Sequence, residues 1–151
     1  MQLKRIQLIF LFLVGTMIFL VLVINKHSER MNTDTKSAQY TTQTIERVPV
    51  ETFQQMIDAD SDAVLLDIRT PQEFQSSKIA GSINIDFYQS DFTSQLTKLD
   101  KDATYLMYCN SGNRSSTALQ QMKDLGFNHV YELQGGITAW NAKQLPTCNN
   151  C

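Results

Sequence analysis

The chain has few cysteines and no surplus of positive charge. Three cysteines occur among 151 residues, and from residue 45 onward eight basic residues stand against thirteen acidic ones, a net charge of −5. Such an acidic part repels phosphate backbones and anionic lipid headgroups, so neither nucleic acid nor an anionic membrane face is expected as its partner. The sequence also lacks an internal repeat, which excludes a repeat array.

One long hydrophobic run lies near the start of the chain. Residues 6–24 are 19 uncharged and almost wholly apolar residues, and a helix of that length extends about 28 Å, enough to span a bilayer. The run is longer than the apolar region of a secretory signal peptide, and no A-x-A pattern closes it. We therefore expect an uncleaved anchor. A cleaved signal, which would leave a secreted protein, and a buried core helix are the alternatives.

The charges beside this run indicate its orientation. Lys4 and Arg5 precede it, which favours a cytoplasmic N-terminus and a globular part on the periplasmic side of the cell membrane. We predict an anchor over residues 1–25, a polar tether over 26–43, one globular domain over 44–146 and a short C-terminal tail over 147–151.

Within the globular part, short apolar clusters alternate with helical patterns. The sequence predicts strands near 44–47, 63–68, 82–85, 105–108 and 130–133, and helices over 50–58, from residue 71, over 90–99, over 116–125 and after residue 135. A capping box from Thr70 to Glu73 begins the second helix. This alternation predicts an α/β fold, an open parallel sheet with helices on both faces, which binds ligands at the carboxyl ends of its strands.

The most informative segment is the turn that follows the strand at 105–108. Residues 109–115 read Cys-Asn-Ser-Gly-Asn-Arg-Ser, so a thiol ends a strand just before a helix. Backbone N–H groups and the helix N-terminus are then expected to point at the sulfur and favour a thiolate, a nucleophile with room above it for an anion. Free cysteine is often a small buried hydrophobe, but the polar turn favours a functional, reachable Cys109. Gly112 marks either a close backbone approach or a plain turn.

Three charged residues lie in this turn or at the end of the earlier predicted strand at 63–68, and the carboxyl ends of the two strands can meet at one edge of the sheet. Arg114 either binds an oxyanion or braces the loop through a carboxylate such as Asp67 or Glu73, and we favour bracing. Asp67 and Arg69 come after the buried apolar run at 64–66, so they need polar partners, and the donors of the cysteine loop are candidates. We interpret both as supporting residues. A simple helix-entry charge pattern is the alternative.

Four segments together resemble a known family. Residues 65–74, 79–85, 109–115 and 133–140 are similar, in this order, to the signature segments of single-domain rhodaneses, and the resemblance spans about residues 45–146. It implies a rhodanese-like sulfurtransferase in which Cys109 takes a sulfane sulfur from thiosulfate or a persulfide donor and passes it to a thiol or cyanide acceptor. The implied cradle around the sulfur is formed by Asn110, Ser111, Gly112, Asn113 and Arg114, with no metal or organic cofactor.

Differences in and around the loop refine this expectation. Certain dual-specificity phosphatases share the fold but have one more residue between cysteine and arginine, whereas four residues separate Cys109 from Arg114 here, which favours sulfur over phosphate. Many family members carry arginine directly after the cysteine, where this chain has Asn110. The loss of that cation favours a small or protein-bound persulfide over thiosulfate. Lys78 and Ala80 stand where the family often has histidine and proline.

The last two cysteines form a terminal C-x-x-C. Cys148 and Cys151 do not precede a helix, so we favour a passive disulfide or a metal-binding tail at a frayed terminus. The alternative is a flexible dithiol that accepts sulfur from Cys109 or regenerates it. Two other functions stay open: a non-catalytic binding module, and a thiol-disulfide oxidoreductase that uses Cys109 with Cys148 and Cys151.

Overall fold

A computed structural model describes residues 43–151. The predicted membrane anchor and all but the last residue of the predicted tether lie outside these described residues. Within the described part, none of the helices combines the length and the apolar character that a membrane crossing requires.

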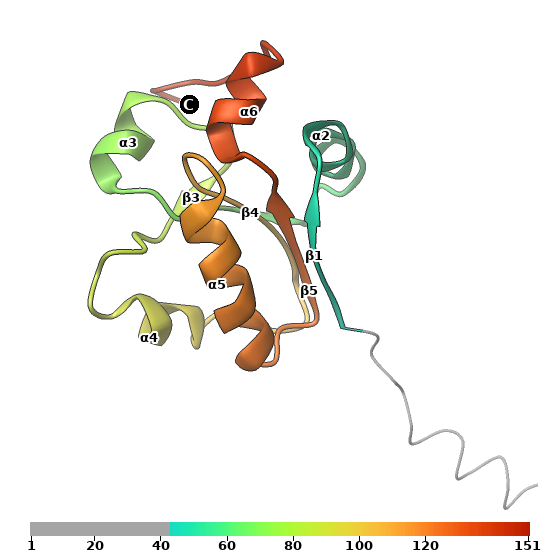
Figure 1. The fold of residues 1–151 in the computed structure, drawn as a ribbon, viewed down its shortest axis with the longest axis vertical. Helices are drawn as coiled ribbons and strands as arrows, with labels where there is room; N and C mark the ends of the chain where they lie inside the picture. Colours follow the sequence, from blue (N-terminus) through green and yellow to red (C-terminus); the bar gives the residue numbers. More distant parts are fainter. Residues whose placement is uncertain (1–42) are drawn as a thin grey trace, which may run out of the picture. The chain divides into compact units, whose positions relative to one another are not determined.

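Five parallel strands form one sheet at the centre of this part (Figure 1). They are β1 (Thr44–Val48), β2 (Val64–Asp67), β3 (Ile83–Asn84), β4 (Thr104–Tyr108) and β5 (His129–Leu133), in the spatial order β1-β5-β4-β2-β3. Asp67 lies opposite Tyr108 in the register of β2 and β4. The segments that follow these two strands therefore begin at the same edge of the sheet.

Helices cover both faces of the sheet because its buried strands are apolar on both sides. On one face, α4 (Phe92–Leu96) and α5 (Asn113–Asp124) contribute to a core with Tyr105 and Met107 of β4. On the other face, α2 (Val50–Ala59) and α6 (Gly136–Ala142) pack with Leu106 and Tyr108. The short helix α3 (Pro71–Ser76) buries none of its residues.

This architecture confirms the predicted parallel sheet with helices on both faces, including the capping box that begins α3. Two helices differ from their predicted bounds. Helix α5 begins at Asn113, three residues early, because Gly112 adopts a left-handed conformation with φ of 91° and the chain turns directly into the helix. Asn113 and Arg114 therefore belong to its first turn. Helix α4 covers residues 92–96 only, since residues 97–99 form turns.

Candidate functional site

Cys109 follows β4 directly, and two backbone N–H groups point at its sulfur. Gly112 N donates to Cys109 Sγ at 3.2 Å and Ser115 N donates at 3.4 Å. Both donors belong to the turn and the first residues of α5, so the sulfur lies where the helix dipole favours negative charge. The turn therefore supplies oriented hydrogen-bond donors to the sulfur.

The sulfur is nevertheless buried. Cys109 is 1% exposed, so the predicted solvent-reachable thiol is wrong for this conformation. The reason is the period-2 alternation of β4, which continues through the turn and places Cys109 with Tyr105 and Met107 in the core beneath α5. Three residues that follow it in the turn are exposed, namely Asn110, Ser111 and Asn113.

The start of α6 holds the outer side of the cysteine turn. Ile137 N donates to the Cys109 carbonyl oxygen at 2.9 Å, and Thr138 N donates to the Asn110 carbonyl oxygen at 3.0 Å. Gly136, with φ of 58°, precedes them and lies directly against these two carbonyls. Two segments whose hydrogen-bonded residues lie 28 positions apart in the sequence are therefore held together by backbone contacts, which sequence reasoning did not reveal.

Arg114 braces the loop against α3. Its guanidinium donates to both carboxylate oxygens of Glu73, at 2.9 and 2.7 Å, and lies over the ring of Tyr88 at 5.4 Å. Of the two partners predicted for Arg114, the structure shows Glu73. This hydrogen-bonded arginine holds the pKa of Glu73 at about 2, below its ordinary value of 4.5.

The ion pair between Glu73 and Arg114 makes the stability of the domain depend on pH. Because folding depresses this pKa, the stabilisation is complete above about pH 4.5 and is lost as the pH falls through about 2. Glu73→Gln should lower the free energy of unfolding at pH 7 by about 1 kcal/mol, since the pair is partly exposed and screened. Urea titrations should then show a weaker pH dependence between 4.5 and 2 than in the unmodified chain. The exposed control Glu46→Gln should leave that dependence intact, and equal slopes for Glu73→Gln would contradict the assignment.

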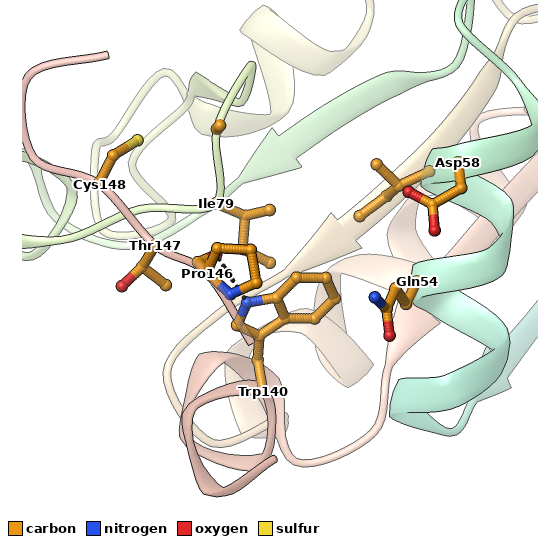
Figure 2. Close-up of a pocket in the computed structure, with 9 residues that line it drawn as sticks. Gln54, Asp58, Ile79, Trp140, Pro146, Thr147 and Cys148 are labelled. Atoms are coloured by element: carbon orange, nitrogen blue, oxygen red, sulfur yellow. Dashed lines mark hydrogen bonds between the residues drawn. The ribbon is translucent and has the colours of Figure 1, made fainter. Parts of the chain in front are cut away.

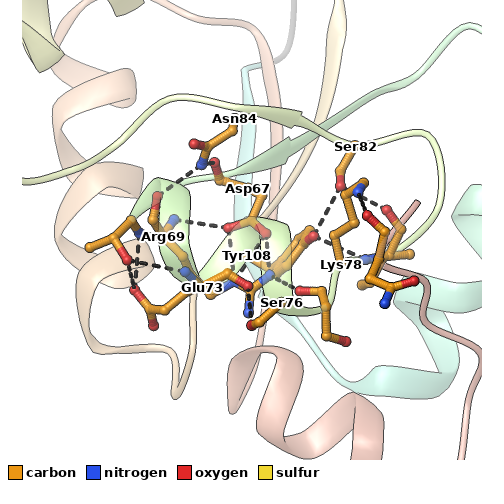
Figure 3. Close-up of polar contacts among 12 residues, drawn as sticks. Asp67, Arg69, Glu73, Ser76, Lys78, Ser82, Asn84 and Tyr108 are labelled. Atoms are coloured by element: carbon orange, nitrogen blue, oxygen red, sulfur yellow. Dashed lines mark hydrogen bonds and ion pairs between the residues drawn. The ribbon is translucent and has the colours of Figure 1, made fainter. Parts of the chain in front are cut away.

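Asp67 and Arg69 bind each other rather than the cysteine loop. Arg69 Nη2 lies 2.6 Å from Asp67 Oδ2 and also donates to the Ser77 carbonyl, and both charged side chains are buried (Figure 3). The guanidinium lies over the ring of Tyr108 at 5.6 Å, and Asn84 donates to the Asp67 and Arg69 carbonyls. The prediction that loop donors satisfy Asp67 and Arg69 is therefore wrong: the pair is self-sufficient and fixes the segment from β2 to α3.

Two polar residues beside the sulfur were missed as site residues. Ser115 Oγ lies 3.3 Å from Cys109 Sγ and 2.6 Å from Glu132 Oε1. Glu132 is fully buried in β5, and its other oxygen accepts a hydrogen bond from Arg47 Nε. The available signal was a carboxylate, Glu132, inside the predicted strand at 130–133, near the end of the sheet where the strand before Cys109 also finishes.

The C-terminal cysteines are joined and held in place. Cys148 pairs with Cys151 in a disulfide, while Cys109 is a free thiol. Cys148 also forms an antiparallel bridge with Lys78, whose ammonium donates to the Asn149 carbonyl. The expected frayed terminus is thus wrong, because backbone hydrogen bonds attach the tail to the segment after α3.

A cavity of about 220 Å³ lies beside this tail (Figure 2). It is lined by residues of α2, α6, the segment after α3 and the tail, including Trp140, Ile79, Pro146 and Cys148. Cys109 does not line it. Over residues 43–151, no three acidic, histidine or cysteine side chains are grouped so that they could hold a metal ion.

One protein family and several known proteins are similar to this chain. The profile of the family described as Rhodanese-like domain matches residues 49–143. Thiosulfate sulfurtransferase GlpE of Pseudomonas savastanoi pv. phaseolicola is 35% identical over 97 residues, covering 64% of this chain and 87% of that protein. Uncharacterized protein slr1261 of Synechocystis is 36% identical over 106 residues, which cover 70% of this chain and 58% of that longer protein.

A solved structure has a similar fold. The crystal structure of a rhodanese-related protein from Thermoplasma volcanium matches with a TM-score of 0.62 and 28% identity, covering 70% of this chain and 99% of that one. The fold of that whole chain is therefore found in this one.

Proposed function

We propose, since the chain belongs to the rhodanese-like domain family, that it is a sulfurtransferase in which Cys109 carries the transferred sulfur. One observation supports this most strongly: Cys109, the only free thiol in the described part, which holds all three cysteines, lies at the end of β4 and accepts hydrogen bonds from Gly112 N and Ser115 N. These donors stabilise an anionic sulfur as oriented amides do in other anion sites.

The proposed reaction has two steps at sulfur. The Cys109 thiolate attacks the sulfane sulfur of the donor, a new S–S bond forms, and the old bond to the donor breaks with its electron pair leaving on the donor, as sulfite in the case of thiosulfate. An acceptor thiolate or cyanide then attacks the outer sulfur of the Cys109 persulfide, and the Cys109 thiolate leaves. No net oxidant is needed, and the protein returns to its starting state.

The donor class is proposed from the turn itself. Asn110 and Ser111 are exposed beside the buried sulfur, and Arg114 is engaged by Glu73 and Tyr88. The turn thus offers amide and hydroxyl groups rather than a free guanidinium to an incoming donor. A persulfide with one negative charge suits this environment better than the doubly charged thiosulfate.

The burial of Cys109 favours a second candidate, a binding module that does not transfer sulfur. A thiol that is 1% exposed reacts only when the residues around it move to admit a donor. In the binding-module case the exposed turn would contact a partner and the thiol would only fill the core. Sulfur loading separates the two candidates.

The test is the intact mass of the full chain, purified in a mild detergent and incubated with a small persulfide or with thiosulfate. We expect a gain of one sulfur, absent in Cys109→Ser and retained in the Cys148→Ser/Cys151→Ser double variant. No gain with either donor would refute the sulfurtransferase and leave the binding module. A disulfide that joins Cys109 to the tail would instead indicate a thiol-disulfide oxidoreductase.

We also propose that residues 6–24 anchor the protein in the cell membrane with its globular part outside the cytoplasm. The uncharged 19-residue run supports the anchor, and the Cys148–Cys151 disulfide suits an oxidising compartment. In a bacterial host the full chain should stay in the membrane fraction after alkaline washing and be cut by protease added to spheroplasts. A chain recovered in the soluble fraction would contradict this placement.

A further inference from the structure

Three polar side chains beside the Cys109 sulfur contact one another in sequence: Ser115, Glu132 and Arg47. Ser115 Oγ lies 3.3 Å from Cys109 Sγ and 2.6 Å from Glu132 Oε1. The second oxygen of Glu132 accepts a hydrogen bond from Arg47 Nε at 2.6 Å. Cys109, Ser115 and Glu132 are each at most 1% exposed. The contacts therefore form a defined route for a proton between a thiol and a buried carboxylate.

The Ser115 hydroxyl has a single hydrogen and two neighbours that can accept it. Its 2.6 Å contact with the Glu132 carboxylate has the length of a charge-assisted O–H···O bond, the stronger of the two possibilities. The Ser115 hydroxyl therefore donates its hydrogen bond to Glu132 Oε1, and the Ser115 oxygen presents a lone pair to the sulfur. A resting Cys109 thiol then donates its own hydrogen to Ser115.

We call Cys109, Ser115, Glu132 and Arg47 the cysteine cluster. Burial limits how much negative charge this cluster can hold. A Cys109 thiolate beside a Glu132 carboxylate would place two anions in the protein interior, where Arg47 is the cation paired with the carboxylate. Such a pair carries a large desolvation cost. If the thiol proton passes to Glu132 instead of to solvent, the cluster keeps one negative charge. Internal transfer therefore allows a thiolate to form without adding a buried anion.

We infer that Glu132, acting through Ser115, takes up the Cys109 proton when the nucleophile forms and returns it after the sulfur has been passed on. This inference rests on the proposed function. The S–H bond breaks with its electron pair left on sulfur, Ser115 Oγ takes that proton, and the original hydroxyl proton of Ser115 moves to Glu132 Oε1. The new Ser115 hydroxyl then donates to the sulfur anion. Glu132 is thus a positioning residue, and Arg47 holds its other oxygen.

The charged groups facing this cluster come from three elements. Arg47 of β1 contacts Glu132, Arg114 of α5 interacts electrostatically with Cys109, and Glu73 of α3 holds Arg114. Arginine keeps its charge throughout the accessible range, and the pKa of Glu73 lies at about 2. A change in Cys109 reactivity between about pH 5 and 9 therefore reports the cluster itself.

The test is the rate at which iodoacetamide alkylates the full chain, in a mild detergent with the Cys148–Cys151 disulfide intact, so that Cys109 is the only free thiol. Because the proton stays inside the cluster, the rate in the unmodified chain should be independent of pH around neutrality. In Glu132→Gln the proton must leave to solvent, so the rate should rise about tenfold per pH unit and be at least about tenfold lower near pH 6.

Matched variants separate this role from a structural one. Ser115→Ala should make the alkylation rate depend on pH as Glu132→Gln does, so the plateau, the pH-independent region around neutrality, is lost. Ser115→Thr should keep this plateau. Glu46→Gln on the exposed side of β1 should not alter it. A plateau that persists in Glu132→Gln, or a rate lowered equally at every pH, would overturn the inference. If Glu132→Gln does not fold, Ser115→Ala decides by the same criterion.

Sulfur loading distinguishes this inference from the function on which it rests. If the unmodified chain gains sulfur on Cys109 but shows no plateau, the inference fails and the sulfurtransferase stands. If the unmodified chain gains no sulfur from either donor, the sulfurtransferase fails, whatever the alkylation profile shows.

Discussion

Replacing Gly136 with alanine is expected to lower the rate of sulfur loading on Cys109 by at least about 100-fold and the free energy of unfolding by about 2–4 kcal/mol. A Cβ at this position would stand 2.6 Å from the Asn110 carbonyl oxygen and still closer to that of Cys109. Both neighbours are backbone atoms of the turn, so relief requires moving the turn itself. The hydrogen bonds from Ile137 N and Thr138 N to these carbonyls would be displaced with it.

Gly126→Ala is the matched control for this substitution. Gly126 also has a positive φ, +84°, but a Cβ there meets nothing within 4 Å. It should therefore show only the conformational cost of a non-glycine residue, about 1 kcal/mol, with normal sulfur loading.

Urea titration and the mass-based loading rate measure the two effects. If Gly136→Ala resembles Gly126→Ala in both stability and loading rate, α6 does not position the cysteine turn. If only stability falls, the start of α6 supports the fold but the turn tolerates displacement.

Much of the fold and the meeting of the site segments could be predicted from local pattern. The capping box at Thr70 is a local signal, and the structure bears it out. The expectation that Asp67 and Cys109 begin segments at one sheet edge required only that β2 and β4 are parallel, and the register places Asp67 opposite Tyr108. These features depend on residues close in sequence or on the general geometry of α/β sheets.

The rest depends on contacts that no local pattern contains. The burial of Cys109 follows from how closely α5 packs on β4, and α5 begins early because Gly112 turns the chain sharply. Glu132 reaches Ser115 because β5 lies beside β4 and α5 crosses above them, although the two residues are 17 positions apart in the sequence. Asp67 and Arg69, two residues apart, were assigned distant partners although the shortest available pairing was with each other.

Replacing Arg69 with methionine is expected to lower the free energy of unfolding by about 3–5 kcal/mol. The Asp67 carboxylate is fully buried, and Arg69 provides its neutralising charge and three side-chain hydrogen bonds. Methionine replaces the unbranched apolar stem of arginine but carries no charge, so the carboxylate would remain in the interior without a cation. The Ser77 carbonyl would also lose a donor, which loosens the segment that leads from α3 to β3. Urea titration of the full chain gives the value.

Two comparisons isolate burial as the cause. The pair Lys143–Glu51 has the same 2.6 Å separation, but both side chains are more than half exposed, so Lys143→Met should leave the urea midpoint where it was. The double variant Asp67→Asn/Arg69→Met removes both charges and should recover much of the stability lost in Arg69→Met, because no buried ion is left unpaired. If the double variant is no more stable than the single one, the cost comes from lost packing against Tyr108 and not from the stranded carboxylate.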